Sequence, residues 1–253
     1  MRLHNKKRSA FSLIELSIVL IIIGLLISGV TGGASLIKSS ELRSVITESR
    51  SWSVSVNSFF NQFDALPGDY DKTLGTQAGG DNDGAIEYDN DGSVGNGDFE
   101  GRNAWRHLAA TNILDTSVIY SGGQSTATLA SAGLPTAALA SFGVFIPASK
   151  VGSAAWDFDH NSDSQNVVVL TGAIGLTASA SNTLVNGTVV STGIITPTDA
   201  LSIDSKYDDG VANTGSIRAA GPNTSTLCFN SGTYVTSTST KTCALSFRVD
   251  VNS

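Results

Sequence analysis

The sequence predicts an α+β protein, in which a long N-terminal helix packs on the antiparallel β-sheet of a head domain. An apolar run from Phe11 to Leu36 continues as apolar residues at three- and four-residue steps up to Leu66, the spacing of one face of a helix. Short stretches typical of strands follow beyond residue 166. Helix and sheet therefore occupy separate parts of the chain, as in α+β folds.

The composition is that of a folded, acidic protein. With 253 residues, 41% hydrophobic and 15% charged, the chain is long enough for one medium domain and an anchoring segment. The net charge is −7, but the first ten residues hold four of the fifteen cations and no acid, so the remainder carries eleven cations against 22 acids. Such a surface offers nothing basic to a phosphate backbone, and we expect no direct contact with nucleic acid.

The run from Phe11 to Leu36 is long enough to cross a membrane. At about 1.5 Å per residue it rises roughly 39 Å, more than a hydrocarbon core of about 30 Å. Glu15 is its one charged residue. The basic residues before the run should stay in the cytoplasm by the positive-inside rule, which leaves the chain after about residue 37 on the far side.

Glu15 distinguishes three interpretations of this N-terminus: a secretory signal peptide, a plain signal anchor and a prepilin leader. A carboxylate inside an apolar segment costs about 2.5 to 3.5 kcal/mol on insertion scales, so such a residue usually has a partner and a function. Simple secretion signals and anchors have no use for one. The small residues Gly33-Ala34-Ser35 could serve as a signal-peptide cleavage site, which keeps that alternative open.

At these residues the sequence resembles the type IV prepilin and type II secretion pseudopilin families, whose signature is a basic leader, a small residue, a Phe and a Glu. Ala10, Phe11 and Glu15 fill the last three positions, with Ala10 in place of the usual Gly. The resemblance implies that a prepilin peptidase cleaves between Ala10 and Phe11 and methylates the Phe11 amine. It also implies that Glu15 pairs with the Phe11 amine of a neighbouring subunit during assembly, which offsets two desolvation costs.

The resemblance implies a basic leader (residues 1–10), a transmembrane and amphipathic helix (11–66) and a pilin-like head (67–253). It implies a structural subunit of a type IV pilus or type II secretion pseudopilus, single-pass in the inner membrane with a periplasmic head and later part of a filament. Other pilin subunits, prepilin peptidase and the inner membrane would be its partners. The mature chain of about 243 residues favours a minor or specialised subunit. A membrane-anchored or surface-displayed binding or adhesion module is the alternative.

In the head we expect one short helix and a few strands. Leu66-Pro67 should end the long helix, because proline cannot continue it, and Ala104 to Leu114 should form the short one. Residues 115–145 and 220–241 are rich in Ser, Thr, Ala and Gly and should form loops or edges. The expected strands are 167–170, a hairpin of 183–185 and 188–190 around Asn186-Gly187, and 244–251.

Seven acids crowd the twenty residues from Asp81 to Glu100. Carboxylates this close repel one another unless a cation compensates, and Ca²⁺ takes six to eight oxygen ligands. The acids that match positions 1, 3, 5 and 12 of the helix–loop–helix calcium template are Glu87, Asp89, Asp91 and Asp98. The loop is thus a candidate calcium site, with a solvated acidic turn as the alternative.

Asp208 and Asp209 form a second candidate calcium pair. The resemblance implies this role, since major pseudopilins bind calcium on an acidic C-terminal loop. Two adjacent Asp residues before Gly210 also make a common turn, which is the alternative. Calcium, at either place, is the one cofactor that we expect.

The two cysteines predict a disulfide. Cys228 and Cys243 enclose fourteen residues near the C-terminus, which indicates one bridge if this part lies outside the cytosol. Such a bridge stabilises a fold by about 3 kcal/mol in the loop-entropy model. Two buried free thiols are the alternative.

Enzymatic chemistry has little support in the sequence. After removal of the leader, His107 and His160 are the remaining histidines, and the chain lacks the common catalytic motifs. His160 could ligate a metal with Asp157 or Asp159, but we favour a polar loop that leads into the strand at Val167. We therefore assign no catalytic residue.

Overall fold

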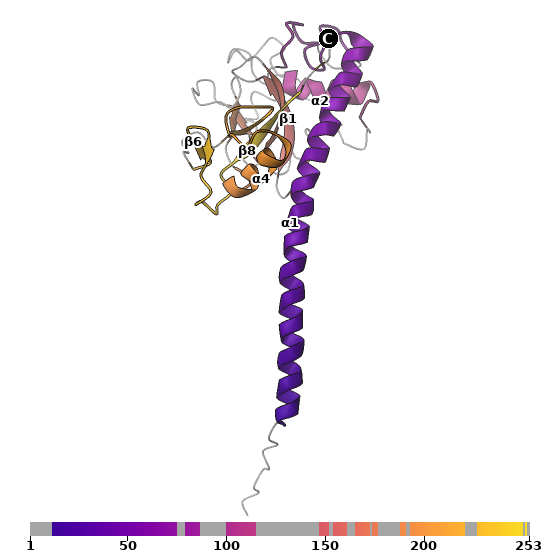
Figure 1. The fold of residues 1–253 in the computed structure, drawn as a ribbon. Helices are drawn as coiled ribbons and strands as arrows, with labels where there is room; N and C mark the ends of the chain where they lie inside the picture. The colour runs from indigo at the N-terminus through magenta and orange to yellow at the C-terminus, as the bar shows by residue number, and fades with distance from the viewer. Residues whose placement is uncertain are drawn as a thin grey trace, which may run out of the picture. The chain divides into compact units, whose positions relative to one another are not determined.

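The structure, a computed structural model, describes residues 12–74, 79–86, 100–114, 147–151, 154–160, 165–172, 174–176, 188–190, 193–220, 227–249 and 251. It confirms the predicted α+β class, since a long helix, α1, is followed by shorter helices and a four-stranded antiparallel sheet (Figure 1). The chain divides into two compact units, Met1–Glu41 and Leu42–Ser253.

Helix α1 runs from Leu13 to Phe63 and contributes residues to both units. In the first unit its large apolar side chains, from Leu13 to Ile37, are exposed by 45% to 87%. An 18-residue window of the helix reaches a mean hydropathy of 2.7, and none of its residues is buried. By length and composition, this part of α1 can therefore cross a membrane.

Helix α1 ends slightly before the proline that was expected to stop it. Asp64 follows the last helical residue with a φ of 55°, in the left-handed region, and its N–H donates to the Phe60 carbonyl at 2.8 Å. Gly68 then has a φ of 94°, and a Cβ at this position would collide with the Glu100 backbone. The chain can thus turn back towards the head only with glycine at position 68.

The second part of α1 supplies one wall of the head's core. Val45, Val56 and Phe59 are fully buried, and Trp52 and Phe63 are partly buried against the same core. The predicted amphipathic stripe of apolar and aromatic residues is confirmed.

Helix α2, Glu100–Ala110, packs beside this stripe. The indole rings of Trp52 and Trp105 meet edge to face, with centroids 5.0 Å apart. The predicted helix at 104–114 exists but begins and ends four residues earlier in the chain, and residues 111–114 form a turn.

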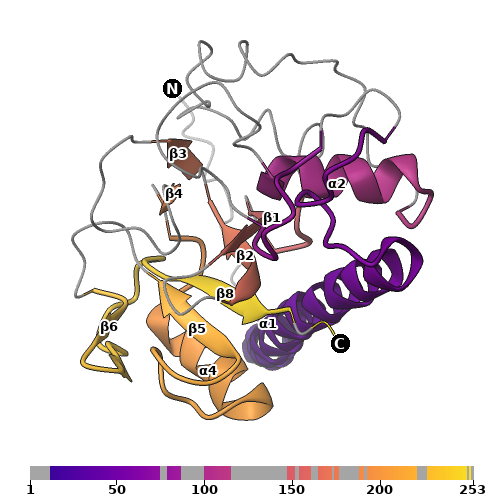
Figure 2. The same ribbon diagram turned by 90° about the horizontal axis from the view of Figure 1, so that it is seen from above.

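The main sheet has the strand order β1-β2-β8-β5, and all neighbours are antiparallel. Helix α2 lies beside β1, and α4 lies beside β5 at the other edge (Figure 2). The prediction of a polar loop around His160 is wrong, because residues 155–160 form a buried strand despite two acids among them. The strands are β1 (Ala155–His160), β2 (Asn166–Thr171), β5 (Ile217–Ala220) and β8 (Ala244–Arg248).

Two small hairpins complete the described strands. Strand β4 (Thr188–Val190) lies where the sequence predicted one, but it pairs with β3 (Ile174–Leu176). Residues 183–187, the predicted partner and turn, lie outside the described residues. Strands β6 (Phe229–Asn230) and β7 (Thr233–Tyr234) form a second hairpin within the stretch that was expected to be loops or edges.

Helix α4, Pro197–Tyr207, was not predicted. Its start carries a recognisable signal, because Thr196 is the N-cap, Pro197 opens the first turn, and the Asp199 N–H donates to Thr196 Oγ1 at 3.2 Å. Ala200 and Ile203 of this helix are buried in the core. Its C-terminal end places three acids close together.

Candidate functional site

Glu15 lies in the first turn of α1, and its side chain is exposed. The Ser12 N–H donates to Glu15 Oε2 at 2.9 Å, and the Ile14 N–H donates to Ser12 Oγ at 3.3 Å. These bonds resemble a capping box, except that Ser12 Oγ accepts from the second helical N–H rather than from the third, and they satisfy N–H groups that a helix start leaves without partners. Ala10 and Phe11 lie outside the described residues. The Glu15 carboxylate is therefore held at the backbone of Ser12, the second residue after the predicted cleavage position.

Glu48, further along α1, is buried and bonded to the head. Its Oε2 accepts from Ser149 Oγ at 2.7 Å and from Trp156 Nε1 at 2.6 Å. Its Oε1 accepts from the Lys150 N–H at 3.1 Å. Sequence reasoning missed this residue, because its partners lie about a hundred positions away in the chain. Glu48 fixes the second part of α1 to strand β1 and the segment before it.

The second calcium pair gains a third acid in the structure. Asp204, in the last turn of α4, joins Asp208 and Asp209, and each of them offers an oxygen within 4.8 Å of the others. Asp204 is fully buried and accepts from Tyr234 OH at 2.7 Å and from the Gly210 N–H at 3.0 Å. The sequence hypothesis did not include Asp204, since only folding of the helix end brings it to the pair.

Two of the carboxyl groups at this helix end have pKa values shifted in opposite directions. Burial raises the pKa of Asp204, and the neighbouring Asp208 and Asp209 raise it further. The pKa of Asp209 is lowered, chiefly by the hydrogen bond from Thr214. Three carboxylates at the negative end of a helix dipole are a donor set that suits a hard cation such as Ca²⁺. The internal hydrogen bonds also suit an ordered acidic turn, and calcium binding here stays a prediction.

The first calcium loop is only partly described. Glu87, Asp89, Asp91 and Asp98 lie outside the described residues. At the two ends of the loop, Asp81 and Glu100 lie with Asp69, each offering an oxygen within 4.8 Å of the others. Burial raises the pKa of Asp69 to about 6, although the N–H groups of Gly84 and Asp83 bond its carboxylate. Asp69 was not a sequence candidate.

The N-terminal residues also match a known family. A family model described as the prokaryotic N-terminal methylation motif matches residues 5–31. The chain carries a prepilin-type signature. The matched segment takes in Ala10, Phe11 and Glu15, and the roles assigned to these residues in cleavage, methylation and assembly stay predictions. Comparison with curated proteins and with solved structures found no match.

The prepilin-type signature and the apolar first part of α1 together indicate a membrane-anchored, pilin-like protein. Prepilin-type proteins are structural subunits rather than enzymes. The predicted disulfide is confirmed, since Cys228 and Cys243 are bridged with their Cα atoms 5.1 Å apart. His107 has a structural position, because it is fully buried and its Nδ1 accepts from the Gly68 N–H at 3.0 Å.

Proposed function

We propose that the protein is a minor or specialised subunit of a type IV pilus or type II secretion pseudopilus. A prepilin peptidase removes its leader, and the subunit enters a filament through the first part of α1. The observation that carries this proposal is Glu15 within an exposed apolar helix and inside the methylation motif.

The exposed apolar helix supports assembly through α1. Burying a leucine- or isoleucine-sized side chain is worth about 1.5 to 3 kcal/mol, so fifteen large apolar residues from Leu13 to Ile37 require a lipid or protein surrounding. Helices of neighbouring subunits supply such a surrounding in a filament, and the bilayer supplies it before assembly.

Glu15 adds specificity to that assembly. In an apolar surrounding its carboxylate is costly unless a cation compensates it. The new amine of Phe11, freed by cleavage, carries the opposite charge. Pairing between the amine of one subunit and Glu15 of the next would fix the axial register between them.

The disulfide and the acidic head fit a head outside the cytosol, where disulfides persist. The same facts also suit the alternative function, a membrane-anchored binding or adhesion module. The two differ in whether subunits assemble through Glu15.

The test is filament assembly of Glu15→Gln, which keeps the shape of the side chain and removes its charge. Ser17→Ala is the control, because Ser17 is also exposed and its hydroxyl donates to the Ile14 carbonyl of its own helix. We expect wild type and Ser17→Ala in the sheared filament fraction, and Glu15→Gln in the membrane fraction alone. Absence of the wild-type protein from the filament fraction would favour the anchored binding module, and assembly of Glu15→Gln at the wild-type level would overturn the role given to Glu15.

A further inference from the structure

Two basic side chains share one aromatic ring where α4 lies beside α1 (Figure 1 and Figure 2). The guanidinium carbon of Arg50 lies 5.7 Å from the centre of the Tyr207 ring, and Lys206 Nζ lies 6.0 Å from it. Both distances are within the range of cation–π contacts. Arg50 and Lys206 are exposed, whereas Tyr207 is half-buried against the core of the second compact unit. We call these three residues the basic seam.

Neither cation of the basic seam is paired within the part of the chain that the structure describes. The side chains of Arg50 and Lys206 form no hydrogen bond or ion pair with those residues. The acids that follow the seam in the chain, Asp208 and Asp209, accept hydrogen bonds from the loop of residues 211–217 instead. Both positive charges are therefore exposed and open to a partner from outside the chain.

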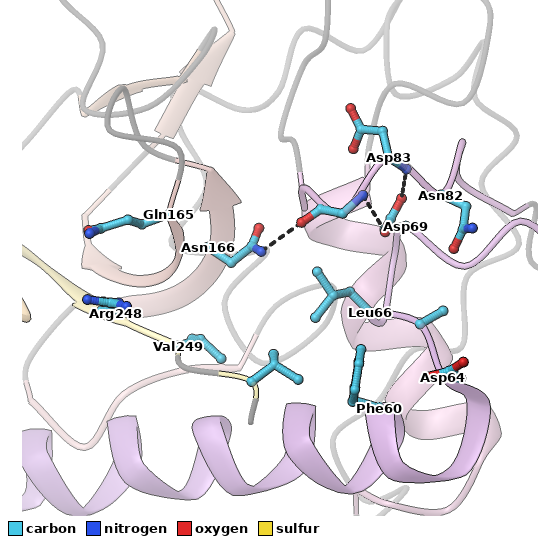
Figure 3. Close-up of a pocket in the computed structure, with 13 residues that line it drawn as sticks. Phe60, Asp64, Leu66, Asp69, Asn82, Asp83, Gln165, Asn166, Arg248 and Val249 are labelled. Carbon is cyan, nitrogen blue, oxygen red and sulfur yellow. Dashed lines mark hydrogen bonds between the residues drawn. The ribbon is translucent and has the colours of Figure 1, made fainter. Parts of the chain in front are cut away.

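The pocket at the C-terminal end of α1 is a poorer place for a partner (Figure 3). It has a volume of about 480 Å³, and Asp69 and Asn166 are among the residues that line it. The Asp69 carboxylate accepts from the N–H groups of Asp83 and Gly84, and Asn166 Nδ2 donates to the Gly84 carbonyl at 3.0 Å. These polar groups bond one another, whereas the charges of the basic seam are left over.

The charge of the chain indicates what the partner is. After residue 10 the chain holds eleven cations against 22 acids. Heads with this charge repel one another when they lie side by side, unless basic groups of one copy meet carboxylates of the next. The proposed function, on which this inference rests, brings copies together through α1, and the same helix carries Arg50. A second copy therefore brings carboxylates to the helix that forms one side of the basic seam.

We propose that the basic seam is an interaction surface for a second copy of this chain, in which Arg50 and Lys206 bind a carboxylate of the neighbouring head. The planar guanidinium of Arg50 presents paired N–H donors that match a carboxylate. Contact with the Tyr207 ring restrains both basic side chains, so less conformational entropy is lost when they bind. The seam thus adds an attractive contact between acidic heads to the contact between their helices.

The test is carbodiimide cross-linking of filaments assembled from a mixture of unlabelled and nitrogen-15-labelled wild-type protein. The carbodiimide joins an amine directly to a carboxylate in contact with it, and Lys206 supplies the amine of the basic seam. A cross-linked pair of peptides with one labelled and one unlabelled member, identified by mass spectrometry, joins two copies. We expect such pairs for Lys206. Wild-type filaments in which Lys206 couples only within its own copy would overturn this inference alone, whereas absence of wild-type filaments would overturn the proposed function as well.

Variants separate the basic seam from the overall charge. Arg50→Gln with Lys206→Gln removes both cations of the seam without adding an acid. Lys72→Gln with Lys241→Gln is the matched control, since it removes two exposed cations elsewhere, and Lys72 Nζ likewise lies 5.7 Å from a tyrosine ring, that of Tyr70. We expect the seam variant to lower the sheared filament fraction about fivefold to tenfold, and the control to assemble as wild type does.

The tryptophan fluorescence of both variants shows whether their heads are folded. Assembly of a folded seam variant at the wild-type level, or an equal loss in the control, would overturn the proposal. A membrane surface is the other acidic partner to exclude. If micelles with anionic lipid slow the amine labelling of Lys206 in the unassembled wild-type protein, the seam binds lipid, and the proposal is wrong.

Discussion

Two stretches of helix α1 differ in what surrounds their side chains. From Leu13 to Ile37 the large apolar residues are exposed, whereas from Val45 to Phe59 most of them are buried in the head. The backbone conformation is the same in both. The helix is therefore continuous, but its two stretches depend on different surroundings: the second packs in the chain's own core, and the first needs an apolar surrounding from outside the chain.

The two glutamates make this contrast specific. Glu15 is exposed and bonds the backbone of Ser12, three residues away. Glu48 is buried and receives hydrogen bonds from Ser149, Lys150 and Trp156. Within one helix, then, one carboxylate is bonded to residues far away in the chain, and the other is bonded to the start of its own helix and stays exposed.

The largest expected effect comes from exchanging Glu48 for an apolar residue. Glu48→Leu leaves three donors without an acceptor and should lower the free energy of unfolding of the head by about 4 kcal/mol. Urea unfolding followed by tryptophan fluorescence measures this, because all three tryptophans lie in the second unit. Glu15→Leu is the matched control and should leave this midpoint unchanged. If both variants lowered the free energy of unfolding of the head equally, the contrast between Glu48 and Glu15 would be wrong.

Loss of the disulfide should come next. Cys228→Ser with Cys243→Ser should lower the free energy of unfolding by about 3 kcal/mol. The shift of the urea unfolding transition should be seen by tryptophan fluorescence alone. The circular dichroism signal of the first part of α1, which stays helical in micelles, should persist in urea. Reduction of the wild-type protein should give the same result. Simultaneous loss of both signals would mean that the two parts of α1 unfold together.

Asp69 tests the head at the end of α1. In wild type, the Asp69 carboxylate accepts from the backbone N–H groups of Asp83 and Gly84. In Asp69→Asn, the side-chain NH₂ group faces one of these N–H groups, so two donors meet, and the free energy of unfolding should fall by about 1 to 2 kcal/mol. Because burial raises the pKa of Asp69 from 3.8 to about 6, the folded head binds a proton that the unfolded chain releases between these values. Wild type should therefore lose stability relative to Asp69→Asn as the pH rises from about 4 to about 6. A difference between the two proteins that is independent of pH would contradict this.

Calcium should have the smallest effect. With a dissociation constant of about 0.1 to 1 mM, 1 mM Ca²⁺ stabilises a fold by only about 1 kcal/mol. That increment should be present in wild type and in Asp71→Asn, and absent in Asp208→Asn with Asp209→Asn and after chelation. If Ca²⁺ stabilises all of these variants equally, Asp208 and Asp209 are not its ligands.

Sequence patterns predicted those elements whose signal is local. The apolar spacing of α1, the apolar run of β2 and the alternation in β8 were sufficient, and so was the pairing of the only two cysteines. Strand β1 was missed because Asp157 and Asp159 gave it a polar composition, although both are buried. Helix α4 was missed even though its cap at Thr196 and Pro197 is a local signal.

The head's internal polar contacts could not be predicted in the same way. The neighbours of Glu48 come from another part of the chain, and Asp204 reaches Tyr234 across thirty residues. A charged residue on a helix normally indicates a solvated face. Only the tertiary fold reveals that these carboxylates are buried and hydrogen-bonded, and no spacing in the sequence marks them.

The central claim is that the N-terminus is a prepilin leader followed by an assembly helix. Intact mass and N-terminal sequencing of the protein, co-expressed with a prepilin peptidase, test it most directly. The account predicts a chain that begins at methylated Phe11, and an Ala10→Leu variant that keeps its leader. An intact Met1 in the wild-type protein would mean a plain membrane anchor, and a start near Ser35 would mean a secreted head, and either result would contradict the account.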